Sequence, residues 1–218
     1  MLDGFLFDPV THSYWLNGRR IPGITELLSI FGYIDKAQYE KRGPNAALRG
    51  KAIHSACELL DQNDLDWTSI TDDGIPYVMG YEKFLKENDI VIEHEWSEKP
   101  LYHPILLFGG TPDRRLILNG RRSIVDLKTG VIQPWAALQT AAQEILMQDE
   151  EPFDRYALRL TPDGDYKLKA FTNPRDLPLF KSLVAHYWNQ VQYGIRKENE
   201  NGNNAQPEQS REEGSLSY

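Results

Sequence analysis

Apolar stretches joined by tight turns predict that much of this chain forms β-hairpins. An Asn-Gly pair between two such stretches is the strongest short-range signal for a two-residue hairpin turn. Three hairpins are expected, at residues 13–21 around Asn17-Gly18, at 109–130 around Asn119-Gly120, and at 153–171 around Pro162-Asp163-Gly164. The Asn119-Gly120 hairpin is the element around which the rest of the chain is arranged.

Apolar residues at helical spacing predict helices between and after these hairpins. They are expected over residues 24–31, 36–41, 46–60, 77–87, 134–147 and 177–195. In the last of these helices, the residues expected to face inward are Leu179, Leu183, Trp188 and Val191.

These elements predict an α/β fold with a mixed central β-sheet flanked by helices. Strands are expected near residues 90–98, 105–118, 121–128, 154–160 and 166–171. Residues 1–197 are expected to form a single domain that begins with the N-terminal hairpin and helices. Residues 198–218 are rich in Asn, Glu, Gln, Gly and Ser, a composition that cannot bury a core, and we expect them to be a disordered polar tail.

The central hairpin carries two acidic residues whose relative position is fixed by its turn. Counting outward from Asn119-Gly120 places Asp113 opposite Asp126 if no bulge intervenes. Directly opposed side chains have Cβ atoms about 4.5–5.5 Å apart, and like charges in such a pair destabilise a sheet. Lys128 follows on the same face as Asp126, because strand side chains alternate. A divalent cation held between the two carboxylates would offset their repulsion.

In the alternative interpretation, Asp113 and Asp126 are ordinary solvated strand residues and Lys128 is a neutralising neighbour. The sequence around them argues against this. Residues 123–127 read Ser-Ile-Val-Asp-Leu, an apolar run with an acid inside it, which is typical of a strand buried on both faces. A carboxylate buried there without a partner would cost too much free energy to be retained. The hairpin is therefore a candidate metal site.

These residues also carry a family resemblance. Pro112-Asp113, followed by Asp126-Leu127-Lys128, resembles the motif of the PD-(D/E)XK nuclease superfamily. The longer pattern GGTPD…IVDLKTG, followed by a helix with Gln139, is similar to the RecB-like exonuclease branch of phages and bacteria. The resemblance implies a restriction-endonuclease-like core and metal-dependent hydrolysis of DNA phosphodiester bonds.

Two further candidate ligands rest mainly on the resemblance. Residues 49–54 resemble the Gly-x-x-x-His helix of RecB-like nucleases, whose histidine adds an imidazole to the metal shell. A histidine beside an apolar helix face can also be a hydrogen-bonded core residue, and both interpretations of His54 stay open. Family members carry a glutamate about one strand before the Pro-Asp, and Glu98 fits that spacing better than Glu95. The alternative for either glutamate is a solvated strand edge.

The resemblance implies a set of metal ligands. Asp113 and Asp126 would bind Mg²⁺ or Mn²⁺, hard cations that take oxygen ligands, with the Leu127 carbonyl as a further candidate. His54 would favour Mn²⁺. The ion would lower the pKa of a bound water and hold a non-bridging phosphate oxygen.

The resemblance also implies catalytic roles beside those of Asp113 and Asp126. Lys128 would orient the attacking water and stabilise the charge that develops on the phosphate. Gln139 would contact the strand or the water shell. The family pattern has a tyrosine four residues after this glutamine, and this chain has Gln143 there instead.

Composition narrows the class of protein. The 218 residues are 40% hydrophobic and 26% charged, which are ordinary globular values. Cys57 is the single cysteine, which excludes a disulfide framework and the four-cysteine iron–sulfur cluster of some RecB-like relatives. The chain has no apolar run near the length of a membrane span, and its N-terminus lacks the basic start of a signal peptide. We therefore expect a cytoplasmic protein with no iron–sulfur cluster and no membrane partner.

The charge of the chain bears on the identity of its partner. A formal net charge of −8 argues mildly against a nucleic-acid binder, although residues 197–218 carry −3 of it. Basic pairs occur at Arg19-Arg20, Lys41-Arg42, Arg114-Arg115 and Arg121-Arg122. Most such pairs are simply solvated surface.

DNA, as single strands or duplex ends, is the expected partner, in replication, recombination or repair. A non-catalytic nucleic-acid-binding or scaffold protein on the same fold is the alternative, but a degenerate site would be expected to lose Asp126 or Lys128. A phosphodiesterase acting on RNA also stays open, because nothing in the sequence is seen to read a 2′-hydroxyl.

Overall fold

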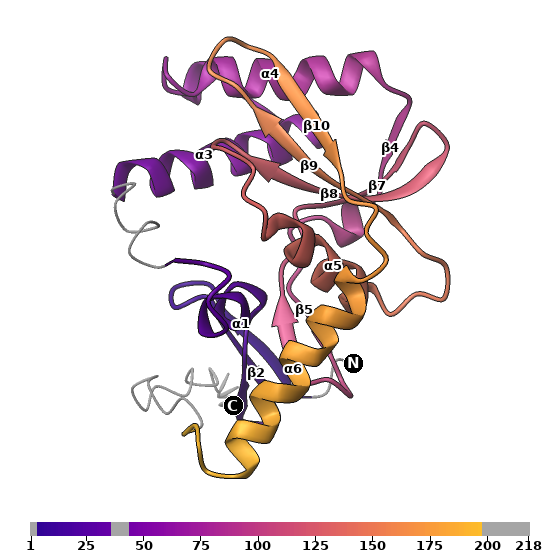
Figure 1. The fold of residues 1–218 in the computed structure, drawn as a ribbon. Coiled ribbons are helices and arrows are strands. Elements are labelled where there is room, and N and C mark those ends of the chain that lie inside the picture. Colours follow the sequence, from indigo (N-terminus) through magenta and orange to yellow (C-terminus); the bar gives the residue numbers. More distant parts are fainter. Residues whose placement is uncertain (1–3, 36–43, 198–218) are drawn as a thin grey trace, which may run out of the picture.

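A mixed β-sheet lies at the centre of the fold (Figure 1). The computed structural model describes residues 4–35 and 44–197. Within them the sheet consists of β4 (Ile90–Ile92), β7 (Arg114–Leu118), β8 (Arg121–Lys128), β9 (Asp154–Leu160) and β10 (Tyr166–Ala170). The strand order is β10–β9–β8–β7–β4, and β8 and β9 are the parallel pair among antiparallel neighbours. The predicted mixed α/β fold is confirmed at this level.

The β7–β8 hairpin has the register that its turn predicts. Leu118 pairs with Arg121. Both turn residues have positive φ, 50° at Asn119 and 78° at Gly120, as a two-residue type I′ turn requires. Residues 123–127 are all buried, so the expectation of a strand buried on both faces is confirmed.

The strand expected over residues 90–98 is much shorter than predicted. It ends at Ile92, and a 3₁₀ turn, η2 (His94–Trp96), follows. The reason is that β4 lies at the edge of the sheet and pairs with β7 alone. After a last hydrogen bond from the Glu93 N–H to the Arg115 carbonyl, the chain turns away.

The strand expected over residues 105–118 is broken into two. Its first part forms β6 (Phe108–Gly110), which pairs with β5 (Leu101–His103) in a separate two-stranded sheet. Pro112 lies between β6 and β7 and has no N–H to donate to a ladder. The break brings the residues before β7 out of the sheet and into the candidate site.

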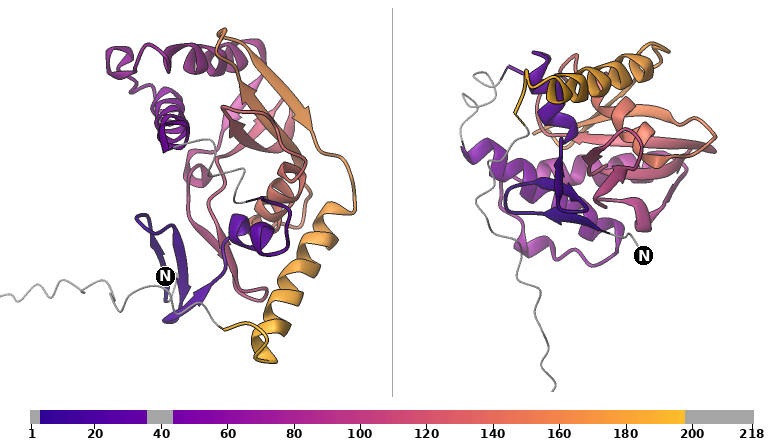
Figure 2. Two further views of the ribbon diagram at one scale, coloured as in Figure 1. Left: turned by 60° about the vertical axis from the view of Figure 1, so that its left-hand side comes forward. Right: turned by 90° about the horizontal axis from the view of Figure 1, so that it is seen from below.

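Helices cover both faces of the central sheet (Figures 1 and 2). α3 (Pro44–Asp61) and α4 (Ile75–Glu87) pack their apolar residues against β7, β8 and β9. They are joined through a short 3₁₀ turn, η1 (Trp67–Ser69). α5 (Ala136–Met147) connects β8 to β9 and packs against both strands from the opposite face. The helices expected over residues 46–60, 77–87 and 134–147 are confirmed to within two residues at each end.

Side chains of β8 alternate between these two helical layers. Val125 and Leu127 belong to the core that β8 shares with α3 and α4. Asp126 and Lys128 form hydrogen bonds to side chains of α5. The alternation therefore directs Asp126 and Lys128 to a single face, as the strand period requires.

The N-terminal residues form a second, smaller sheet. Its strands are β1 (Phe5–Asp8), β2 (Ser13–Leu16) and β3 (Arg19–Ile21), antiparallel in that order. β2 and β3 are the hairpin expected at Asn17-Gly18, whereas β1 is a strand that the sequence pattern does not predict. α1 (Ile24–Ile30) follows, as expected.

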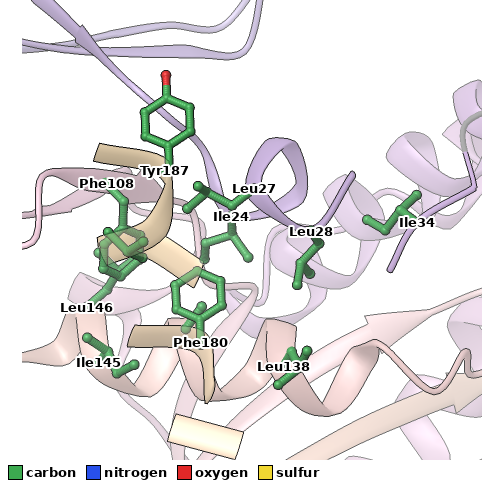
Figure 3. Packing of buried hydrophobic residues seen from close by; sticks show 12 residues of the cluster. Ile24, Leu27, Leu28, Ile34, Phe108, Leu138, Ile145, Leu146, Phe180 and Tyr187 are labelled. Carbon is green, nitrogen blue, oxygen red and sulfur yellow. The ribbon is translucent and has the colours of Figure 1, made fainter. Parts of the chain in front are cut away.

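A second core joins this N-terminal part to the helices of the central sheet. Figure 3 shows Phe108, Ile145, Leu146 and Phe180 gathered where α5 meets α6 (Asp176–Gln192). The rings of Phe108 and Phe180 meet edge to face, with centroids 5.2 Å apart. α1 contributes Ile24, Leu27 and Leu28 to the same core.

The inward face of α6 differs from the prediction. Phe180, Val184 and Tyr187 are buried, whereas Leu179, which was expected to face inward, is exposed. The packing of Phe180 on Phe108 sets the buried stripe one residue beyond Leu179. The other expected inward residues are partly buried against the same core: Leu183, Trp188 and Val191.

Two expectations fall on residues that the structure does not describe, the helix over residues 36–41 and the disordered tail over residues 198–218. The boundary of the domain at residue 197 stays a prediction for the same reason. Of the helices in the described part of the chain, none has both the length and the apolar character needed to cross a membrane.

Close backbone contact at Gly109 connects the N-terminal sheet to the segment that leads to Asp113. The Gly109 N–H donates to the Pro22 carbonyl at 3.0 Å, and Gly109 pairs with Gly23 in an isolated bridge. A Cβ atom at Gly109 would lie 2.4 Å from Cγ of the buried Tyr14. The position therefore requires a glycine for steric reasons.

Replacing Gly109 by alanine should destabilise the protein by about 1–3 kcal/mol, the usual cost of overpacking a core. The matched control is Gly50→Ala in α3, where the nearest atom to a new Cβ is Thr129 Oγ1, at an ordinary contact distance of 3.5 Å. This control should be neutral or stabilising by up to about 1 kcal/mol, because alanine favours a helix over glycine. Urea unfolding measures both, and equal stability of the two variants would contradict the steric account.

Candidate metal centre

Three side chains of metal-ligand type converge near the start of β7. His54 comes from α3, Glu98 from the loop after η2, and Asp113 from the residue before β7. One ligand atom of each lies within 4.8 Å of the other two. The His54 Nδ1 is 3.7 Å from Glu98 Oε1 and 3.7 Å from Asp113 Oδ1. The structure therefore brings together three of the residues that the sequence singled out.

Asp113 lies just beyond the β7–β8 ladder. The last pair of the ladder is Arg114 with Val125, so the expected pairing of Asp113 with Asp126 falls one step past its end. Asp113 Oδ2 accepts a hydrogen bond from the backbone N–H of Leu127 at 2.6 Å. This bond fixes the carboxylate against β8.

Asp126 is fully buried and has partners for both carboxylate oxygens. Its Oδ2 forms an ion pair with Lys128, and Gln143 Nε2 donates to its Oδ1 at 3.1 Å. Burial raises the pKa of Asp126, the charge of Lys128 lowers it, and the charge of Asp113 raises it again, with a raised pKa as the result. The sequence analysis expects a bound cation to offset the repulsion between the two carboxylates. Lys128, a residue of the protein itself, provides part of that positive charge. The group of three does not include Asp126.

Lys128 lies between Asp126 and α5. Its Nζ donates to Gln139 Oε1 at 3.0 Å and lies 5.5 Å from the centre of the Trp135 ring. The Lys128 side chain is 19% exposed, so part of it is accessible to solvent. The contact of Gln139 with a DNA strand or a water shell stays a prediction, since the partner seen here is Lys128. Gln143 donates to Asp126.

The surroundings of His54 favour a ligand over a core residue. Its side chain is 26% exposed and faces two carboxylates at distances longer than a hydrogen bond. Burial lowers the pKa of His54, but the charges of Asp113 and Glu98, with a smaller effect of Asp126, outweigh it and raise the pKa overall. A core histidine would instead be enclosed and hydrogen-bonded.

The donor set fits a divalent cation. It offers one imidazole nitrogen and carboxylate oxygens from Glu98 and Asp113, and oxygen ligands suit Mg²⁺ and Mn²⁺ while the imidazole favours Mn²⁺. All three side chains are partly exposed, which leaves room for water or substrate. The Leu127 carbonyl stays a predicted ligand.

Arg114 is a residue of the site that the sequence analysis treated as half of a solvated basic pair. This was wrong, because the Arg114 side chain is completely buried. It forms ion pairs with Asp61, at the end of α3, and with Glu98. The sequence did contain a signal for this burial. Side chains alternate along β7, and Arg114 lies on the same face as Leu116 and Leu118, which are both buried.

Four more arginines of the predicted basic pairs form ion pairs with acidic side chains. They are Arg20 with Glu26, Arg115 with Glu93, Arg121 with Asp154, and Arg122 with Asp149. Arg19 lies over the Trp188 ring. Lys41-Arg42 lies outside the described residues. These four described arginines are therefore already paired with acidic side chains.

A scan against protein-family models finds no match for this sequence, and a search of curated proteins finds none either. The chemistry of the site therefore rests on its own residues. Two groups of side chains make it up: the three ligand candidates, and the Asp126–Lys128 pair with its partners on α5. The hydrogen bond between Leu127 and Asp113 connects the two groups.

The raised pKa of His54 predicts how the metal-free protein responds to pH. A histidine whose folded-state pKa lies above its unfolded value near 6.5 stabilises the fold most below that value, and this contribution is lost as pH rises through the folded-state pKa. In a chelator, His54→Gln should therefore lower the free energy of unfolding more at about pH 6 than at about pH 9. Urea unfolding at the two pH values measures the difference.

His103 provides a control with the opposite sign. Burial and the charge of Lys181 lower its pKa, and its Nδ1 accepts the Leu106 N–H at 3.1 Å. Its contribution to stability is present above its unfolded pKa and is lost as pH falls, so His103→Gln should be more harmful at about pH 9 than at about pH 6. The same pH trend in both variants would contradict the electrostatic description of His54.

Proposed function

We propose that this chain is a metal-dependent DNA nuclease of the RecB-like branch of the PD-(D/E)XK superfamily, built on a restriction-endonuclease-like core. The observation that carries the proposal is the meeting of His54, Glu98 and Asp113 beside the Asp126–Lys128 pair. These residues come from α3, a loop and both arms of the hairpin. An ordinary sheet gains nothing from placing three acids and a histidine at one strand end, where their repulsion costs stability. We propose further that the reaction is exonucleolytic and serves replication, recombination or repair.

The arrangement of the sheet supports this proposal. The β7–β8 hairpin delivers one carboxylate on each arm, and α5 then crosses to the parallel strand β9. The same helix provides Gln139 and Gln143 to the charged face of β8. A mixed sheet with helices on both faces is what a restriction-endonuclease-like core requires.

Asp113, Glu98 and His54 are the residues that would hold Mg²⁺ or Mn²⁺, with Asp126 and the Leu127 carbonyl as further candidates. When bound, such an ion lowers the pKa of a coordinated water and stabilises negative charge on a phosphate. The Asp113 carboxylate is already held by the Leu127 N–H before an ion binds. The hydrogen bond also keeps the carboxylate in one orientation.

Lys128 is the group that acts on the reacting atoms in this proposal. Its Nζ is held by Asp126 and by Gln139 Oε1, so its position is fixed before substrate arrives. An ammonium group is a compact positive charge, and at this place it can orient the attacking water or stabilise the phosphate oxygen that gains charge. Donors fixed in advance at the point of charge development lower the barrier most effectively.

Substrate contact is proposed at the same end of the sheet. Arg49 and Lys51 lie on α3 within two turns of His54, and Lys51 is exposed. Cations there would bind the phosphates that flank the scissile bond. A protein that only bound nucleic acid would not need the Asp126–Lys128 pair, and that argument ranks the non-catalytic alternative lower.

Replacing Asp126 by asparagine should reduce cleavage of linear DNA in saturating Mg²⁺ or Mn²⁺ by at least about 10²-fold, because Lys128 loses the charge that holds it. Glu144→Gln is the matched control. Glu144 is also an acid with little exposed side chain, and burial raises its pKa, but it contacts Arg155 and the Phe153 N–H instead of the site. This control should cleave at the parent rate.

Labelled single-stranded, linear duplex and circular DNA, and RNA of the same sequence, distinguish the alternatives. The proposal expects metal-dependent loss of linear DNA while circular DNA survives. Cleavage of RNA alone would establish the RNA-directed alternative, and metal-independent binding without cleavage would establish the non-catalytic one. Full activity of Asp126→Asn would remove the proposed site.

A further inference from the structure

A completely buried arginine lies directly behind the candidate metal centre. Arg114 is 0% exposed. Its Nε donates to Asp61 Oδ2 at 2.5 Å, and its Nη1 donates both to Glu98 Oε1 at 3.2 Å and to the Asp113 carbonyl at 2.7 Å. Tyr81 completes the cluster, since its hydroxyl donates to Asp61 Oδ1 at 2.8 Å.

Burying the charged side chain of Arg114 costs free energy, and its presence here needs an explanation. A buried ion pair is often no better for stability than apolar residues of similar volume, so its presence is weak evidence for a purely stabilising role. Leu116 and Leu118 share the face of Arg114 on β7 and show that this face accepts apolar side chains. A leucine at position 114 could not bind carboxylates. The planar guanidinium group of an arginine can bind two of them at once.

The contacts of Arg114 reach all three candidate ligands. It binds the Glu98 carboxylate itself and the backbone of Asp113. It reaches His54 through α3, because Asp61 is on the same helix seven residues later, which is two turns and therefore the same face. The Arg114–Asp61 ion pair thus holds α3 against β7 next to the candidate metal centre.

The backbone at Glu98 gives a second, independent reason to look for a restraint. Its φ of 50° lies in the left-handed region, which a residue other than glycine adopts at a cost. Its N–H donates to the Pro112 carbonyl at 3.0 Å and to the Asp113 carbonyl at 3.3 Å, and Arg114 binds its side chain. Glu98 is therefore held at both its backbone and its carboxylate in the conformation that directs it to His54.

We propose that Arg114, anchored by Asp61, is a positioning residue that assembles the cation site by holding Glu98, Asp113 and the helix that carries His54. This inference rests on the cation site of the proposed function, but it concerns metal binding and does not require that DNA be the substrate. Arg114 contacts neither the cation nor the reacting atoms. It acts through the ligands.

The test is calorimetric titration of Mn²⁺ into the full-length protein, its Arg114→Lys and Asp61→Asn variants, and the control Arg155→Lys. Arg155 is a matched control, since it is also buried and bonds to two carbonyls and to Asp176 Oδ2, yet it touches none of the three ligands. We expect Arg114→Lys and Asp61→Asn to weaken Mn²⁺ binding by about 10–100-fold, the usual effect of removing the partner of a metal ligand. Arg155→Lys should keep the parent affinity even though its melting temperature falls.

Melting curves in a chelator show that each titrated variant is folded, and if Arg114→Lys does not fold, Asp61→Asn decides the outcome. Electron paramagnetic resonance of bound Mn²⁺ should show the site refilling at raised Mn²⁺ in the weakened variants, as expected when position is lost but ligands remain. Parent affinity in both Arg114→Lys and Asp61→Asn would overturn the proposal, and so would an equal loss in Arg155→Lys.

The same experiment separates this inference from the proposed function. A parent protein that binds Mn²⁺ in an Arg114-dependent way but cleaves no DNA supports the inference and defeats the nuclease. A parent that cleaves DNA with Mn²⁺, and whose Arg114 and Asp61 variants bind Mn²⁺ as it does, supports the nuclease and defeats the inference. Absence of Mn²⁺ binding by the parent defeats both.

Discussion

A carboxylate buried inside a sheet must be paired, and much of this structure follows from how Asp126 meets that requirement. Lys128 lies two residues along the same face and pairs with one oxygen, while Gln143 reaches from α5 to the other. Because a two-residue turn fixes the register of the hairpin, Asp113 arrives from the other arm at the same place, where the Leu127 N–H binds it. Two carboxylates and one ammonium group are thus concentrated at one strand end by local geometry alone.

The remaining elements bring ligands to that point and hold them there. α3 contributes His54, the loop after η2 contributes Glu98, and both are connected to β7 through the buried side chain of Arg114. The N-terminal sheet packs on the segment before Asp113, where Gly109 allows Tyr14 to approach the backbone. The site is therefore held by several elements. Such support keeps the like charges close together, because their repulsion would otherwise push the ligands apart.

The sequence predicts the parts of this site that depend on neighbours along the chain. The Asn-Gly turn and the period of two predict the register of the hairpin and the shared face of Asp126 and Lys128, because hairpin register follows from the turn. The predicted pairing of Asp113 with Asp126 falls one step past the end of the ladder. Features that depend on distant packing were missed. The burial of Arg114 requires Asp61 to arrive from α3, the partner of Gln143 requires α5 to cross β8, and the exposed position of Leu179 follows from the contact of Phe180 with Phe108. The early end of the strand at Ile92 likewise reflects its edge position, which no local pattern records.

The central claim is that His54, Glu98 and Asp113 form a divalent-cation site beside the Asp126–Lys128 pair. Anomalous diffraction from crystals of the full-length protein grown with Mn²⁺ tests it most directly, because the signal locates the ion without reference to activity. The account predicts a strong anomalous peak at about 2.0–2.6 Å from a carboxylate oxygen of Asp113 and in contact with His54 or Glu98. No peak at these residues, or an ion held elsewhere in the protein while they remain without one, would contradict it.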